Sequence, residues 1–208
     1  MSTWIKICGI TRRADAEAVV AAGADALGIN FAARSPRRVG IGRAREIADA
    51  TEGRITRVGV FVDAPPGEIE SVLAEVPLDV LQFHGDESGA ACRRYGKPYL
   101  KALRVRAPLA MATLEAEYAD AMALLLDAFV PGQSGGTGRC FDWTLFPRRS
   151  TLPLVLAGGL EPGNVAAAVR ELRPWGVDAA GGVEAGVPGE KDAARIQQFV
   201  DEVRCAGS

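Results

Sequence analysis

The sequence has little of what metal sites and disulfide frameworks require. It contains one histidine and four cysteines, Cys8, Cys92, Cys140 and Cys205, and no two of the cysteines form a CxxC pair. Zinc sites and small disulfide-rich folds depend on closely spaced Cys and His residues. We therefore expect neither a metal site nor a disulfide, and each thiol has to be judged by its own surroundings.

Long apolar runs and a large net charge are also missing. No apolar run approaches the roughly 20 residues that span a bilayer, and the first residues lack the basic-then-apolar pattern of a signal peptide. The 24 Lys and Arg residues nearly balance the 26 Asp and Glu residues, which leaves a net charge of −2. We therefore expect a cytoplasmic protein that binds a small molecule, and neither nucleic acid nor a membrane.

Short runs of Val, Ile, Leu and Phe recur along the chain and are typical of buried strands. Most connecting segments carry Ala, Glu, Arg and Leu at helical spacing, as in residues 14–23, 42–50 and 161–172. Alternating strands and helices indicate a parallel sheet. One (β/α)8 TIM barrel that occupies residues 1–208 as a single domain fits best, and an open doubly wound sheet is the alternative. The expected strands are residues 4–10, 26–31, 57–62, 80–85, 99–105, 123–129, 154–159 and 177–182.

Two candidates for acid–base catalysis lie at strand ends, where the chemistry of a TIM barrel is found. Cys8 closes the first strand two residues after Lys6, whose charge favours a thiolate. The alternative is a small, buried, apolar residue. Asp127 ends an apolar run, and burial there would raise its pKa and suit a general acid. A hydrogen bond that orders the following loop is the alternative for Asp127.

Three glycine clusters follow neighbouring strands near the C-terminal end of the chain. They are residues 132–138 after the sixth strand, Gly158 and Gly159 after the seventh, and Gly181 and Gly182 after the eighth. Glycine lets backbone N–H groups approach an anion, and the loops after strands seven and eight are the usual phosphate site of this barrel. The clusters predict a phosphorylated ligand, although any one of them could be simple turn chemistry.

An arginine cluster and the single histidine complete the candidates. Arg34, Arg37 and Arg38 follow the second strand, where a guanidinium fork could bind a carboxylate or phosphate, and at least two of them could equally be surface charges. His84 ends the fourth strand without a partner that the sequence identifies, so a role near the substrate and a structural role both stay open. Asp178, in the eighth strand, is interpreted as structural.

Six motifs, taken in order, resemble those of the phosphoribosylanthranilate isomerases, and the resemblance spans nearly the whole chain. This family implies an Amadori rearrangement of N-(5′-phosphoribosyl)anthranilate to 1-(2-carboxyphenylamino)-1-deoxyribulose 5-phosphate in tryptophan biosynthesis, with no cofactor and no metal. The motifs are KICGIT at 6–11, LQFHGDE at 81–87, LLLD at 124–127, GGTGRCFDW at 135–143, LAGGL at 156–160 and GVEAGVPGEKD at 182–192.

The resemblance also implies roles for individual residues. Cys8 would be the general base, Asp127 the general acid, and Arg37 the residue that binds the anthranilate carboxylate. His84 stays a candidate substrate-binding residue. Relatives commonly carry two serines where this chain has Ala180 and Gly181, so hydroxyl contacts to the phosphate are lost. The expected phosphate site consists of backbone amides near Gly136, Gly158, Gly159, Gly181 and Gly182.

Two other functions compete with this one. A histidine-pathway or dual-substrate sugar isomerase shares the chemistry and the barrel but carries an aspartate as the base on the first strand, so Cys8 argues against it. A phosphosugar-binding barrel without activity is the second alternative, and the presence of both Cys8 and Asp127 argues against it. The sequence leaves open whether the protein is a monomer or a homodimer.

Overall fold

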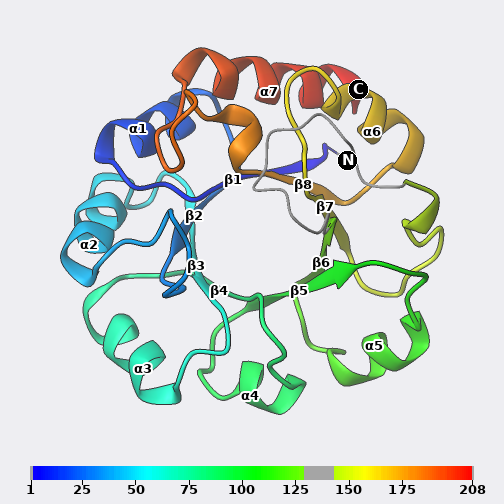
Figure 1. Cartoon of the computed structure of the whole chain (residues 1–208), viewed down its shortest axis with the longest axis horizontal. Helices are drawn as coiled ribbons and strands as arrows, with labels where there is room; N and C mark the ends of the chain where they lie inside the picture. The colour runs from blue at the N-terminus through cyan, green and yellow to red at the C-terminus, as the bar shows by residue number, and fades with distance from the viewer. Residues whose placement is uncertain (1, 129–142, 208) are drawn as a thin grey trace.

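The computed structural model describes residues 2–128 and 143–207, and its strands close into a barrel (Figure 1). All neighbouring strands are parallel and follow one another in sequence, and the last strand pairs with the first. The TIM barrel predicted from the sequence is therefore confirmed. The strands are β1 (Trp4–Cys8), β2 (Ala26–Asn30), β3 (Thr56–Phe61), β4 (Val80–Phe83), β5 (Tyr99–Val105), β6 (Ala123–Ala128), β7 (Leu154–Ala157) and β8 (Gly176–Ala179).

The helices form an outer ring around the strands (Figure 1). In residues 143–153, the described part of the connection between β6 and β7, the structure has the 3₁₀ turn η1 (Trp143–Leu145) and no α-helix. A second 3₁₀ turn, η2 (Gly181–Val183), follows β8. The helices are α1 (Arg13–Ala21), α2 (Ile41–Ala50), α3 (Pro66–Glu75), α4 (Gly89–Arg93), α5 (Met111–Glu117), α6 (Val165–Leu172) and α7 (Ala193–Ala206).

Most strands end before the apolar runs that predicted them. The first run extends to Ile10, but β1 ends at Cys8 because Gly9 has a φ of +74°, which an extended strand does not allow. Gly158 and Gly159, with φ of +87° and +71°, end β7 in the same way. These turns bring the residues that follow each strand over the mouth of the barrel.

Alternation along each strand separates the barrel interior from the layer beneath the helices. In β1, Ile5 and Ile7 are fully buried in the core shared with the helices, whereas Lys6 and Cys8 occupy the other face of the strand. The interior is filled by a second cluster of small and branched residues. These are Ala26, Val58, Val80, Leu100, Ala102, Ala123, Leu125, Val155 and Ala157.

The last helix joins the two ends of the chain. Arg204 in α7 donates to the carbonyl of Thr3 at 2.7 Å and to the carboxylate of Asp25 at 3.0 Å. Phe199, on the buried face of α7, is fully enclosed. Within residues 2–128 and 143–207, none of the helices combines the length and the apolar character that a membrane crossing requires.

Candidate active site

One side of the barrel mouth is built around Cys8, at the inward-facing end of β1. Cys8 lies beside Gly28 of β2 in the sheet register, and a Cβ atom on Gly28 would approach the Cys8 sulfur to 2.8 Å. The missing side chain on β2 therefore makes room for the thiol. One layer deeper, Lys6 is completely buried and its ammonium donates to Asp178 of β8 at 2.8 Å.

The environment of Cys8 acts on its thiol in two opposing ways. Burial raises the pKa of the Cys8 thiol, although the positive charges of Lys6 and Lys191 act in the opposite direction. Burial alone would also lower the pKa of Lys6, but the Asp178 carboxylate and Cys8 outweigh it and raise that pKa. The ammonium of Lys6 is therefore committed to Asp178, whose carboxylate raises the pKa of Cys8 further.

The other side of the mouth carries Asp127, at the inward-facing end of β6. Its carboxylate lies 3.1 Å from His84 Nε2, and His84 Nδ1 lies 3.1 Å from the side-chain nitrogen of Gln82. The Gln82 amide donates to Nδ1, so the ring proton sits on Nε2 and is donated to Asp127. Asp127 is not enclosed by the apolar run before it, since its side chain is 31% exposed.

Sequence inspection alone could not find a partner for His84, and the structure supplies Asp127, which is 43 residues away. Gln82 of β4 is buried, and among the described residues its Oε1 atom finds no hydrogen-bond partner. The three side chains form a chain of contacts from the barrel interior to the mouth, with Asp127 at its outer end.

A buried ion pair holds the loop that presents His84. Glu87 accepts the backbone N–H groups of Asp63 and Gly85 at 2.8 and 2.9 Å and the ammonium of Lys101 at 2.9 Å. Lys101 also donates to the carbonyl of Gly85 at 2.6 Å. Because Glu87 and Lys101 are nearly enclosed, this pair fixes the turn after β4 against β3 and β5.

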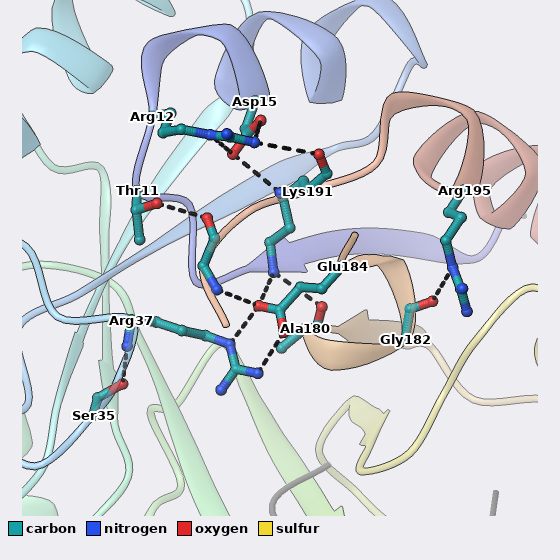
Figure 2. A network of polar contacts seen from close by, with 11 residues as sticks. Thr11, Arg12, Asp15, Ser35, Arg37, Ala180, Gly182, Glu184, Lys191 and Arg195 are labelled. Atoms are coloured by element: carbon teal, nitrogen blue, oxygen red, sulfur yellow. Dashed lines mark hydrogen bonds and ion pairs between the residues drawn. The ribbon is translucent and has the colours of Figure 1, made fainter. Parts of the chain in front are cut away.

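A third group of side chains centres on Glu184, in the segment after β8 (Figure 2). Arg37, from the loop after β2, makes a two-pronged ion pair with Glu184: Nε to Oε1 is 2.6 Å and Nη2 to Oε2 is 2.7 Å. Glu184 also accepts Lys191 Nζ at 3.0 Å and the N–H of Gly189 at 2.8 Å. The stem of Arg37 packs on Gly9, where a Cβ atom would clash with it.

Arg37 differs in this respect from the two arginines beside it. Arg34 and Arg38 are exposed, whereas the Arg37 side chain is only 21% exposed. Burial of the Glu184 carboxylate opposes its ionisation, but its hydrogen bonds from Arg37 and Gly189 and the charge of Lys191 prevail and lower its pKa. Among the three arginines singled out from the sequence, the structure therefore brings Arg37 alone into a network at the mouth.

The glycine loops after β7 and β8 lie against each other. A Cβ atom on Gly182 would clash with the carbonyl oxygen of Leu160, so the two loops meet through backbone. Gly181 and Gly182 begin the turn η2, and Gly158 and Gly159 form the turn after β7. Gly136 and the rest of the glycine cluster after β6 lie outside the described residues.

Other predicted features are placed as follows. Cys92 is buried in α4 and Cys205 is exposed in α7, while Cys140 lies outside the described residues. No group of three or more His, Cys, Asp or Glu side chains in residues 2–128 and 143–207 is arranged to hold a metal ion.

Sequence inspection missed Glu184, Lys191 and Gln82 as residues of the mouth, whereas Asp178, interpreted as structural, pairs with the buried Lys6. Glu184 and Lys191 lie within the motif at 182–192, and Gln82 lies within the motif at 81–87. Their polar character inside otherwise apolar or glycine-rich segments was the available signal. What the sequence does not reveal is which partner each of them meets across the barrel.

Comparisons with known proteins agree with this architecture. A sequence model of the family described as N-(5'phosphoribosyl)anthranilate (PRA) isomerase matches residues 5–202. The N-(5'-phosphoribosyl)anthranilate isomerase of Cellvibrio japonicus is 53% identical over 199 residues, which cover 96% of this chain and 92% of that protein.

Solved structures give the same result. Phosphoribosyl anthranilate isomerase from Thermotoga maritima superposes with a TM-score of 0.88 at 38% identity, and the match covers 98% of this chain and 99% of that one. A phosphoribosyl anthranilate isomerase in complex with reduced 1-(o-carboxyphenylamino)-1-deoxyribulose 5-phosphate gives a TM-score of 0.84 at 35% identity, with 98% and 99% covered. The chain therefore belongs to the N-(5'-phosphoribosyl)anthranilate isomerase family.

Proposed function

We propose that Cys8 and Asp127 are the base and the acid with which this chain isomerises N-(5′-phosphoribosyl)anthranilate in tryptophan biosynthesis. One observation carries the assignment: Cys8 on β1 and Asp127 on β6 both face into the barrel near the ends of their strands. These two strands lie on different sides of the ring (Figure 1). A sugar bound across the mouth would meet one of them on each side. Amadori chemistry requires such a pair of proton-transfer groups.

The proton transfers balance within the substrate. Asp127 acts in its protonated form: it donates its proton to the ring oxygen as the bond between that oxygen and C1′ breaks, and the anthranilate nitrogen forms a protonated Schiff base. This iminium group acidifies C2′, from which the thiolate of Cys8 removes a proton to give an enolamine. Tautomerisation moves a proton from O2′ to C1′ through solvent and yields the ketose. Cys8 ends as a thiol and Asp127 as a carboxylate, and a proton that passes from Cys8 to Asp127 through solvent restores both groups.

The neighbours of Asp127 suit this role. The Nε2 proton of His84 is donated to the carboxylate, so it stabilises the charge that remains after Asp127 has given up its proton. Because the Asp127 side chain is partly exposed, water can return the proton after each turnover. His84 thus supports the acid, and we also propose it as a substrate-binding residue.

Binding would use the two ends of the substrate. The free edge of the Arg37 guanidinium would take the anthranilate carboxylate, in a planar two-bond arrangement. The phosphate would rest on backbone amides of the glycine loops, near Gly136, Gly158, Gly159, Gly181 and Gly182, which anchors the sugar at a distance from the reacting carbons. The proposal requires only this small-molecule substrate and no cofactor. It holds for a monomer and for a homodimer.

The first test is direct turnover. Phosphoribosylanthranilate is generated in situ, and the loss of its anthranilate fluorescence is followed for the unmodified protein and for Cys8→Ala and Asp127→Val. Each variant should lower kcat by more than about a hundredfold, the scale of a lost acid or base. Cys205→Ala removes an exposed thiol and serves as the matched control, with an unchanged rate.

The outcomes separate the alternatives. No turnover by the folded, unmodified protein would eliminate the isomerase and leave a phosphosugar-binding barrel. Turnover that persists in Cys8→Ala at near the original rate would keep the isomerase but remove Cys8 as its base.

A further inference from the structure

The strongest unexplained feature of the mouth is the commitment of Arg37 to Glu184. A guanidinium group has five N–H donors in a rigid plane. Glu184 occupies the edge formed by Nε and one hydrogen of Nη2, at 2.6 and 2.7 Å. Within residues 2–128 and 143–207, no hydrogen bond reaches the other edge, formed by Nη1 and the second hydrogen of Nη2.

The Glu184 carboxylate is itself held by two further contacts. Its Oε1 atom accepts the N–H of Gly189 and the ammonium of Lys191, and Lys191 is tied to the carbonyl of Ala180 at 2.9 Å (Figure 2). Glu184 and Lys191 also face each other in a short antiparallel bridge. The carboxylate therefore cannot swing away without breaking the fold of this segment.

The ion pair also leaves Arg37 with an effective charge. Lys191 shares the negative charge of Glu184, so Glu184 does not neutralise the guanidinium completely. On its other side the Arg37 stem rests on Gly9. Arg37 is thus held both at its aliphatic stem and along one edge of its guanidinium plane. Because its orientation is fixed in advance, the side chain loses less conformational entropy when a carboxylate binds.

We infer that Glu184 is a positioning residue that holds the free edge of Arg37 toward the mouth and so makes the site selective for a substrate that carries a carboxylate on its aromatic ring. This inference rests on the proposed function and deepens it. Glu184 acts through Arg37 and does not touch the reacting carbons. Removing its charge should affect binding of the carboxylate and leave the proton transfers intact.

The test compares two ligands. One is reduced 1-(2-carboxyphenylamino)-1-deoxyribulose 5-phosphate, and the other is the same compound without the carboxyl group. The unmodified protein should prefer the first by on the order of 10- to 100-fold in Kd, the scale of hydrogen bonds to a charged group. In Glu184→Gln this preference should fall by about tenfold, while the Kd of the carboxyl-free ligand changes less than about twofold.

Turnover gives a second readout. Glu184→Gln should raise KM for phosphoribosylanthranilate by about tenfold and leave kcat within about threefold, since Cys8 and Asp127 are untouched. Glu184→Asp retains the charge but shortens the side chain, and should lose part of the preference while the protein stays folded. Glu190→Gln is the matched control, because Glu190 lies in the same segment and makes an exposed ion pair with Arg12.

Three results would overturn the inference. Equal weakening of both ligands in Glu184→Gln and Glu184→Asp would show that Glu184 only supports the fold. Tighter binding of the carboxylate ligand would show that Glu184 competes with the substrate for Arg37. An unchanged preference would show that Arg37 needs no such support. In each case turnover by the unmodified protein decides separately whether the isomerase assignment stands.

Discussion

Cys8 combines two demands that oppose each other. A general base must be deprotonated to act, yet burial between β1 and β2 raises the pKa of this thiol. The ammonium of Lys6 lies beneath Cys8 but is already paired with Asp178. Because the Asp178 carboxylate acts in the opposite direction, Lys6 lowers the pKa of Cys8 less than an unpaired ammonium would. In the proposed mechanism, the burial that keeps water away from C2′ also disfavours the thiolate form of Cys8.

A pH profile tests this at the level of the residue. Because the pKa of Cys8 is raised, the thiolate fraction of the free enzyme grows as pH increases. The ratio of kcat/KM of the unmodified protein to that of Cys8→Asp should therefore rise nearly tenfold per unit from about pH 6.5 to about pH 8.5, since the titration of Asp127 is common to both proteins. Cys8→Asp supplies the contrast, since an aspartate ordinarily titrates at about 3.9 and its profile should lack this alkaline rise. A ratio that does not change with pH would mean that Cys8 is already a thiolate or is not the base.

Among the structural elements, the turn after β4 shows how the barrel supports Asp127. Glu87 and Lys101 are nearly enclosed, and together they bind the turn through Asp63 and Gly85. This turn presents His84, which contacts Asp127 on β6. A buried ion pair that satisfies neighbouring backbone groups is costly to break, because the remaining charge stays without a partner.

Glu87→Ala should therefore lower the free energy of unfolding by about 3–5 kcal/mol. It should also reduce kcat, because His84 loses its fixed position beside Asp127. The exposed ion pair of Glu70 with Arg94 provides the control, and Glu70→Ala should change stability by less than about 0.5 kcal/mol. Urea unfolding and steady-state kinetics measure both effects. Equal stability of the two variants would contradict the role given to the Glu87–Lys101 pair.

Much of the fold and part of the site could be predicted from the sequence. Strands buried on both faces leave continuous apolar runs, so all eight were found, and their ends located Cys8 and Asp127. The pairings could not be predicted, because Lys6 and Asp178 are 172 residues apart and Arg37 and Glu184 are 147 apart. The raised pKa of Cys8 also depends on packing against Gly28, which only the register of β1 and β2 establishes.

For the whole molecule, stability depends on how the last helix covers the first strand. Helix α7 packs against α1, α6 and β1, and Arg204 ties it to Thr3 and Asp25. Phe199 fills the centre of its buried face. Every strand of a closed barrel pairs with two neighbours. Weaker packing of α7 therefore also weakens the pairing of β8 with β1 that closes the barrel.

Phe199→Ala should therefore lower the free energy of unfolding by about 3–5 kcal/mol through the cavity it leaves. Unfolding should remain a single transition, and kcat/KM at low temperature should stay close to that of the unmodified protein, because α7 supplies no residue to the proposed chemistry. The neighbouring exposed residue gives the control, and Gln198→Ala should leave the unfolding midpoint unchanged. Two separate unfolding transitions in Phe199→Ala would contradict this picture of one cooperative barrel.

The network around Glu184 also joins the first loop of the barrel to the last. Thr11 donates to the carbonyl of Gly189 at 2.6 Å, and Asp15 accepts the backbone N–H of Lys191 at 3.2 Å. A nascent chain synthesised only as far as β7 therefore carries Cys8 and Arg37 without the residues that orient them. The contacts that hold Arg37 at this side of the mouth therefore form only when the segment after β8 is present.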